Sequence, residues 1–204
     1  MPALTQLVVA DDRVTWERLG FAVAPDGICR LGAVAVRLAG AGAARGILSW
    51  SLEGDPGAID GLAAAADEPP PGQPVAHPNG ARGLDHVVVA TPDVARTFAA
   101  LAAAGLELRR VREAGSAERP LRQGFYRIGE ALLEVVGPPE PAGDGPAAFW
   151  GLVVVVDDLD ALAARLGPHL GRPRAAVQAG RRIATLRRPA GSSVALAFMT
   201  PRNS

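Results

Sequence analysis

One pattern recurs along the chain, and it limits the possible folds more than any other feature. Its clearest copy begins at Gly83, where the apolar run 86–90 predicts a buried strand and Thr-Pro-Asp at 91–93 predicts a helix N-cap. The stretch 95–104 is rich in helix formers and ends at Gly105, a residue suited to a C-cap. Three strand-like stretches follow, at 106–112, 123–128 and 130–136. The predicted order is strand, helix, strand, strand, strand.

A second copy of the pattern starts at Phe149. Its segment Gly-Leu-Val-Val-Val-Val-Asp-Asp-Leu aligns with His-Val-Val-Val-Ala-Thr-Pro-Asp-Val of the first, and its helix is predicted at 159–166. Its later strands are predicted at 175–178, 182–186 and 194–199. The two copies predict an α+β fold of paired βαβββ modules, 83–138 and 148–201, with mainly antiparallel strands and helices outside a cupped sheet.

Residues 1–66 predict a degenerate module of the same kind. Thr5-Gln6 overlays Asp85-His86, the stretch 31–40 overlays 128–137, and a short helix is expected around 13–19. Two further stretches, 46–52 and 58–66, predict the opening strand and helix of a partial module. The proline-rich connection 67–82 then predicts a linker before the domain 83–204.

Charge and cysteine content exclude several classes of protein. The chain has 21 basic and 21 acidic residues, and every basic one is arginine. Nucleic-acid binding is not expected without a basic excess, and the lack of lysine excludes Schiff-base chemistry and a P-loop. The single cysteine, Cys29, cannot form an internal disulfide. No apolar run reaches the ~18–20 residues that cross a bilayer, so we expect a soluble cytoplasmic protein without a membrane partner.

The opening Gly-Leu-Asp-His-Val-Val-Val-Ala-Thr-Pro-Asp at 83–93 and the close Gly-Glu-Ala-Leu-Leu-Glu-Val-Val-Gly at 129–137 carry a family resemblance. Together with the tandem repeat, they resemble the glyoxalase / bleomycin-resistance / extradiol dioxygenase superfamily, also called the vicinal oxygen chelate superfamily. The resemblance implies two modules around a divalent metal, which chelates two neighbouring oxygens of the substrate and stabilises an enediolate or activates dioxygen. It also implies a homodimer, since modules of this superfamily exchange between chains.

Carried over to this chain, the resemblance places His86 and Glu134 at metal-ligand positions. An imidazole and a carboxylate suit Zn, Fe, Mn or Ni, and Glu134 is in addition a candidate catalytic residue that shuttles a proton. If the partner module is the C-terminal copy, the corresponding ligand positions are Gly151 and Ala197, whose side chains cannot bind metal. If it is the N-terminal copy, it supplies Gln6 and Arg37.

Other polar residues are candidates for ligand contacts. A third metal ligand could be Gln123 or His77. Gln123, Tyr126 and Arg37 are candidate substrate-binding residues. Arginines at 109, 110, 112, 181, 182, 187 and 188 indicate either a solvated strand face or a site for an anionic substrate.

Two functions from different classes remain open. One is a metal-dependent lyase, isomerase or dioxygenase acting on a small oxygenated metabolite. The other is a non-catalytic protein that sequesters a small molecule without metal, as resistance proteins of the superfamily do.

Overall fold

The computed structural model describes residues 2–42, 44–67 and 72–202 of the chain. The N-terminal part contains β1 (Leu4–Val9), α1 (Arg13–Arg18), β2 (Ile28–Leu31), β3 (Val34–Leu38) and β4 (Ile47–Leu52). The first complete module contains β5 (Ala81–Ala90), α2 (Val94–Ala103), β6 (Leu108–Gly115), β7 (Pro120–Ile128) and β8 (Ala131–Gly137). The second contains β9 (Ala148–Val156), α3 (Leu159–Leu166), β10 (Arg174–Ala175), β11 (Arg182–Thr185) and β12 (Ala195–Met199), with short 3-10 turns at Gly167–His169 and Arg188–Ala190.

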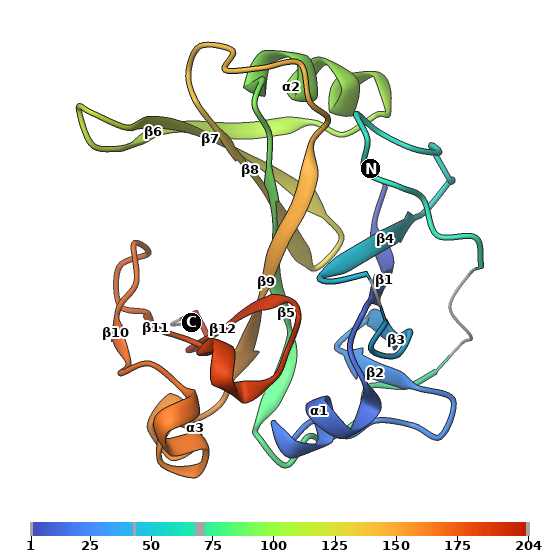
Figure 1. Cartoon of the computed structure of the whole chain (residues 1–204), viewed down its shortest axis with the longest axis vertical. Coiled ribbons are helices and arrows are strands. Elements are labelled where there is room, and N and C mark those ends of the chain that lie inside the picture. Colours follow the sequence, from blue (N-terminus) through green and yellow to red (C-terminus); the bar gives the residue numbers. More distant parts are fainter. Residues whose placement is uncertain (1, 43, 68–71, 203–204) are drawn as a thin grey trace.

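The two complete modules share one eight-stranded sheet in the order β10-β11-β12-β9-β5-β8-β7-β6. Each module has the same internal pairing, because β5 is parallel to β8 and β9 is parallel to β12. The modules join through β5 and β9, which pair antiparallel in the middle of the sheet (Figure 1). The predicted α+β class and paired βαβββ modules are therefore confirmed, and the pairing occurs within one chain.

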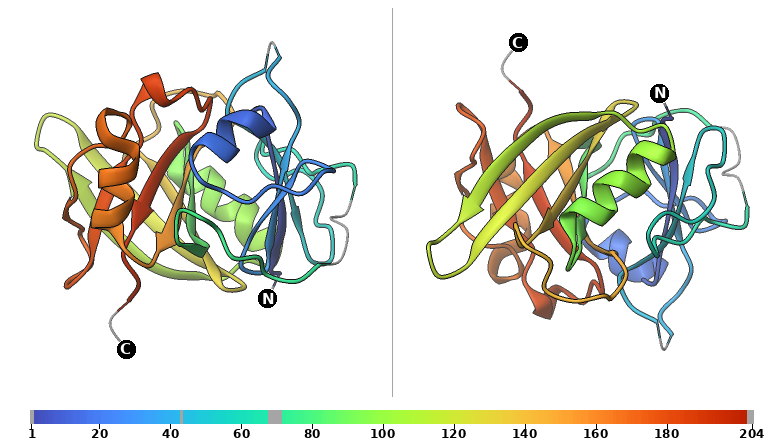
Figure 2. Two further views of the ribbon diagram at one scale, coloured as in Figure 1. Left: turned by 90° about the horizontal axis from the view of Figure 1, so that it is seen from below. Right: turned by 90° about the horizontal axis from the view of Figure 1, so that it is seen from above.

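Helices α2 and α3 begin where the sequence predicts, because local capping residues fix their first turns. The Asp93 carboxylate accepts a hydrogen bond from the Arg96 amide, and the Asp158 carboxylate accepts from the amides of Asp160 and Ala161. Each carboxylate thus satisfies backbone donors that a helix leaves free at its start. The helices pack on the core side of the large sheet, which leaves the opposite face open as a cup (Figure 2).

The N-terminal strands form a separate four-stranded sheet in the order β2-β3-β1-β4. Its register repeats that of the first complete module. Gln6 of β1 pairs with Ala35 and Val8 pairs with Arg37, as His86 pairs with Leu132 and Val88 pairs with Glu134. Gln6 and Arg37 therefore stand at the positions of His86 and Glu134, as the sequence overlay predicts.

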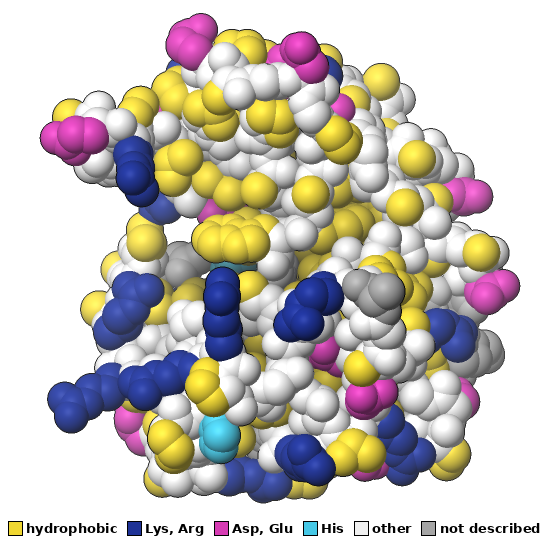
Figure 3. Space-filling view, in the orientation of Figure 1, with side chains coloured by type: hydrophobic (Ala, Val, Ile, Leu, Met, Phe, Trp, Pro, Cys, Tyr) yellow, Lys and Arg dark blue, Asp and Glu magenta, His cyan; other side chains and the backbone are white. Residues whose placement is uncertain are grey.

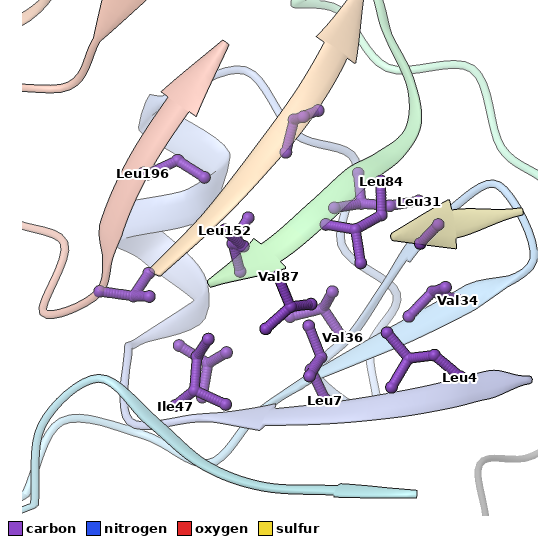
Figure 4. Close-up of a cluster of buried hydrophobic side chains, with 14 of the residues drawn as sticks. Leu4, Leu7, Leu31, Val34, Val36, Ile47, Leu84, Val87, Leu152 and Leu196 are labelled. Atoms are coloured by element: carbon purple, nitrogen blue, oxygen red, sulfur yellow. The ribbon is translucent and has the colours of Figure 1, made fainter. Parts of the chain in front are cut away.

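One hydrophobic core joins the two sheets. Side chains of both meet in the cluster of Figure 4, which includes Leu7 and Val36 of the small sheet and Val87 and Leu152 of the large one. All four are at most 1% exposed. This burial removes one face of each sheet from water and leaves the other face of the large sheet outside the core.

The predicted helix over 58–66 is absent. The segment forms turns and isolated bridges, and its backbone adopts positive φ at Asp60 (47°) and Gly61 (90°), outside the helical region. Contacts from distant residues hold this shape. Arg96 of α2 pairs with the Asp60 carboxylate at 2.8 Å, and a Cβ at Gly61 would lie 2.3 Å from Pro146. In the described part of the chain, no helix is long and apolar enough to span a membrane.

Candidate functional site

The cup of the large sheet contains a cavity of about 540 Å³. Its walls come from β5, β6, β7 and β8 of the first module and from the β10–β11 region of the second. The polar residues that line it are His86, Arg110, Arg112, Gln123, Glu134, Arg174, Gln178 and Arg202. The space-filling view shows a hollow on this molecule with arginine side chains on both sides of it (Figure 3). The cavity therefore combines a polar wall with a positively charged rim.

A chain of contacts crosses the polar wall through Glu134. His86 Nε2 lies 3.6 Å from Glu134 Oε2, and the Gln123 amide nitrogen donates to Glu134 Oε1 at 2.6 Å. Arg112 Nε in turn donates to the Gln123 amide oxygen at 2.8 Å. Arg112 thereby fixes which end of the Gln123 amide faces Glu134. The structure brings together three of the residues expected at the site, His86, Gln123 and Glu134.

Behind His86 lies a buried ion pair that joins the two modules. His86 Nδ1 contacts the Asp85 carboxylate at 2.8 Å, and Arg181 NH2 lies 2.6 Å from the other oxygen of Asp85. Burial alone would raise the pKa of Asp85, but its hydrogen bonds and charge interactions with His86 and Arg181 lower that pKa to about 2. Asp85 is therefore ionised, and an ionised Asp85 requires Nδ1 of His86 to carry a proton. His86 therefore presents its Nε2 to Glu134 and to the cavity.

The opposite wall of the cup is apolar. Its lining residues there include Ala176, Val177, Ala179 and Ile183. Ala176 and Ile183 pack in turn against a small buried cluster of Val153, Ala197 and Met199. Gly151 and Ala197 are the partner-module positions for metal ligands, and neither has a side chain that binds metal. Gly151 also has no room for one, because a Cβ there would lie 2.3 Å from the Ala195 carbonyl oxygen.

Two expected substrate-binding residues lie away from the cavity. Tyr126 is 1% exposed and points to the helix side of β7, where its ring meets Phe98 edge-on at 5.9 Å. Burial raises the pKa of its hydroxyl, which has no hydrogen-bond partner in the described structure. Arg37 lies on β3 of the small sheet and is not among the residues that line the cavity.

His77, considered as a third ligand, has a structural role instead. The Ala22 amide donates to its Nδ1 at 3.0 Å, so Nε2 carries the proton and donates to the Arg30 carbonyl at 2.7 Å. Both ring nitrogens are occupied, and the ring packs edge-on against Phe21. His77 thus fixes the chain between the two sheets.

The sequence does not predict the roles of three arginines in or behind the cavity. Arg174 and Arg202 line the rim, and Arg181 supports His86 through Asp85. The sequence does show the arginine density around 181–188, which suggested an anion site. It does not show which of those side chains turns inward.

The cavity offers few donor groups for a catalytic metal site. Such sites commonly use three protein ligands, whereas only His86 and Glu134 face each other here. In the described ranges, no group of three or more His, Cys, Asp or Glu side chains could hold a metal ion. The donor set therefore falls short of a complete metal centre.

No family model matches the chain, and no curated protein matches it. Solved structures do resemble it. A methylmalonyl-CoA epimerase from Mycobacterium tuberculosis is 21% identical over 61% of this chain and 91% of that one, with a TM-score of 0.48. A hypothetical protein from Bacillus halodurans C-125 is 15% identical over 59% and 95%, with a TM-score of 0.46. A Streptomyces coelicolor methylmalonyl-CoA epimerase in complex with 2-nitronate-propionyl-CoA is 20% identical over 59% and 97%, with a TM-score of 0.44.

The strand pairing itself decides the architecture. Two βαβββ modules, each with parallel first and last strands, join antiparallel into one cupped sheet. The fold is glyoxalase-like. At these identities the likeness concerns the fold and not the chemistry of the site.

Proposed function

We propose that this chain is a glyoxalase-like protein that binds a small, oxygenated anion in its cup without a resident metal. One observation carries the proposal: a polar wall built on Glu134 faces an apolar wall, under a rim of arginines. Arg110, Arg174 and Arg202 form no ion pair within the described residues, so their charge is available to a ligand.

The chemistry of the walls suggests the class of ligand. The Glu134 carboxylate accepts hydrogen bonds, which suits a hydroxyl group, and the His86 ring lies beside it. Guanidinium groups at the rim suit a carboxylate or a phosphate, which they can bind in a bidentate manner. A small hydroxy acid or its phosphate ester satisfies both, with its carbon atoms against Ala176 and Ile183.

Binding can be tested by calorimetry with a panel of hydroxy acids and phosphate esters, each matched with a neutral diol. We expect anions to bind and diols to bind at least tenfold more weakly. Glu134→Ala and an Arg110→Met/Arg174→Met double variant should each reduce affinity, whereas Arg119→Ala, on the exposed β6–β7 turn, should not. Equal binding of diols and anions would contradict the proposal.

A metal-dependent enzyme is the second candidate, and one observation favours it. A carboxylate on Nδ1 that leaves Nε2 free is the usual arrangement behind a metal-bound histidine. His86 and Glu134 would hold Zn, Fe, Mn or Ni, which when bound would act as a Lewis acid toward a substrate oxygen. The remaining coordination positions would have to be filled by water or substrate.

Metal content of the purified, tag-free protein separates the two candidates. Our proposal predicts little metal and no change in melting temperature on addition of divalent ions. Near-stoichiometric metal that is lost in both His86→Ala and Glu134→Ala would contradict our proposal. It would favour a metal-dependent lyase, isomerase or dioxygenase instead.

The homodimer and the cytoplasmic location stay predictions. The cup is formed by modules of one chain, so a homodimer is not needed to complete it. Light scattering at several concentrations tests the oligomeric state.

A further inference from the structure

A second cavity, of about 670 Å³, lies at the other end of β11 from the candidate site. It is bounded by the start of β9, the end of β11 and the loop that leads into β12. Its walls include Arg45, Trp150, Thr185, Arg187, Arg188 and Ser192. It shares no lining residue with the cavity in the cup.

Trp150 is the large exposed aromatic residue of this cavity. Its side chain is 63% exposed, whereas Trp16 and Trp50 are at most 1% exposed. An irregularity in the strand pairing accounts for this. Val88 pairs with Gly151 and Val89 pairs with Phe149, so Trp150 is the extra residue of a β-bulge. The Phe149 ring turns inward and packs at 5.3 Å against Trp50. The bulge thus places a flat indole surface in contact with solvent.

Positive charge surrounds this ring. Arg45, Arg187 and Arg188 line the cavity and no acidic residue does. Within the described residues none of the three forms an ion pair, although the whole chain has no net charge. Arg187 makes one long hydrogen bond, from NH1 to the Pro168 carbonyl at 3.4 Å. Three guanidinium groups beside an exposed indole form an electrostatic site for an anion.

The wall between these arginines is held in place from behind. The buried Asp11 carboxylate accepts hydrogen bonds from the Ser192 hydroxyl at 2.7 Å and the Ser193 amide at 2.6 Å. The Ser193 hydroxyl donates to the Ala10 carbonyl at 3.0 Å. The loop is therefore anchored to the N-terminal sheet, and its arginines project from a fixed backbone.

We propose that this cavity binds a phosphate ester of an aromatic compound, such as a nucleotide. The aromatic ring stacks on Trp150, and the phosphate groups bind Arg187, Arg188 and Arg45. Arginine pairs with phosphate in a bidentate geometry, and a base stacks on an indole regardless of its identity. This site is separate from the cup, and its ligand binds whether or not the cup is filled.

Ligand binding at this cavity can be followed by tryptophan fluorescence, because Trp150 alone of the three tryptophans is exposed. Because Trp16 and Trp50 are buried, fluorescence quenching by acrylamide reports mainly on Trp150. We expect ADP to protect the fluorescence from acrylamide and to bind with a Kd of about 1 mM or tighter. Adenosine and inorganic phosphate, each alone, should bind at least tenfold more weakly. Calorimetry with ADP gives the affinities independently of the optical signal.

Variants assign the binding to this cavity. Trp150→Leu and an Arg187→Ala/Arg188→Ala double variant should each weaken ADP binding at least tenfold, while Arg119→Ala and Glu134→Ala should leave it unchanged. Circular dichroism checks that each variant is folded. Absence of ADP binding, equal binding of adenosine, or loss of binding in Glu134→Ala would overturn the proposal. The last outcome would place the nucleotide in the cup instead.

Discussion

Arg181 and Asp85 form an ion pair that is buried beneath the cup, with both side chains 3% exposed. The pair crosses from the second module to the first, and Asp85 also contacts His86. One interaction therefore connects the module interface with the polar wall of the cavity.

Removing one charge of this pair should destabilise the protein strongly. Asp85→Asn leaves the Arg181 guanidinium buried without its counter-ion, and breaking a buried pair in this way costs about 3–5 kcal/mol. Arg181→Met should have a comparable effect on the free energy of unfolding. Urea denaturation followed by circular dichroism measures both.

The double variant Asp85→Asn/Arg181→Met is the control for that prediction. It removes both charges, so its loss of stability should be smaller than the sum of the single losses. Additive losses would show that the two side chains do not interact.

Arg112→Met should reduce ligand affinity with little effect on stability. Arg112 holds the Gln123 amide, which in turn holds Glu134, and without it Gln123 can rotate. We expect affinity for the anions that bind in the cup to fall about tenfold, or about 1.4 kcal/mol. Titration calorimetry gives the affinity. A drop of more than a few degrees in melting temperature would indicate a structural role for Arg112 instead.

Gly151→Ala should destabilise the sheet by about 1–3 kcal/mol, because the added methyl group would meet the Ala195 carbonyl of the neighbouring strand. Gly145→Ala is a matched control, since the nearest atom to its Cβ would be 4.0 Å away. It should change the unfolding free energy by less than about 0.5 kcal/mol. A fully stable Gly151→Ala would mean that this position has room for a ligand side chain.

Cys29 should be unreactive in the folded protein. Burial raises the pKa of its thiol to about 12, so the reactive thiolate is scarce at pH 8. Folding keeps the proton on this group while an unfolded thiol loses it near pH 9, so unfolding should become easier as pH rises from about 9 to 12. Ellman's reagent measures the reactivity with and without denaturant, and Cys29→Ala should flatten the pH dependence. Rapid reaction of Cys29 with Ellman's reagent in the folded protein would contradict its burial.

The sequence predicts what depends on local signals. The N-caps at Asp93 and Asp158 and the repeated strand pattern are all visible in short windows, and the modules follow from them. His86 and Glu134 can be placed because each lies within such a repeated segment.

Residues set by distant contacts were harder to predict. The Ala-rich stretch 58–66 has helix propensity, but Arg96 and Pro146 impose a different backbone there. Tyr126 was expected beside Gln123, yet the two are an odd number of positions apart on a strand with regular pairing. They therefore face opposite sides of the sheet. The orientation of Arg181 depends on Asp85, far away in sequence.

The contacts of Asp11 also bear on the order in which the parts of the chain fold. Its carboxylate lies in the first β-α connection, but its hydroxyl and amide partners at Ser192 and Ser193 are synthesised 181 and 182 residues later. During synthesis this acidic group cannot be buried with its full set of partners until the loop before β12 has been made. The docking of the N-terminal sheet is therefore expected to be a late, slow event, as is usual for contacts between distant parts of a chain.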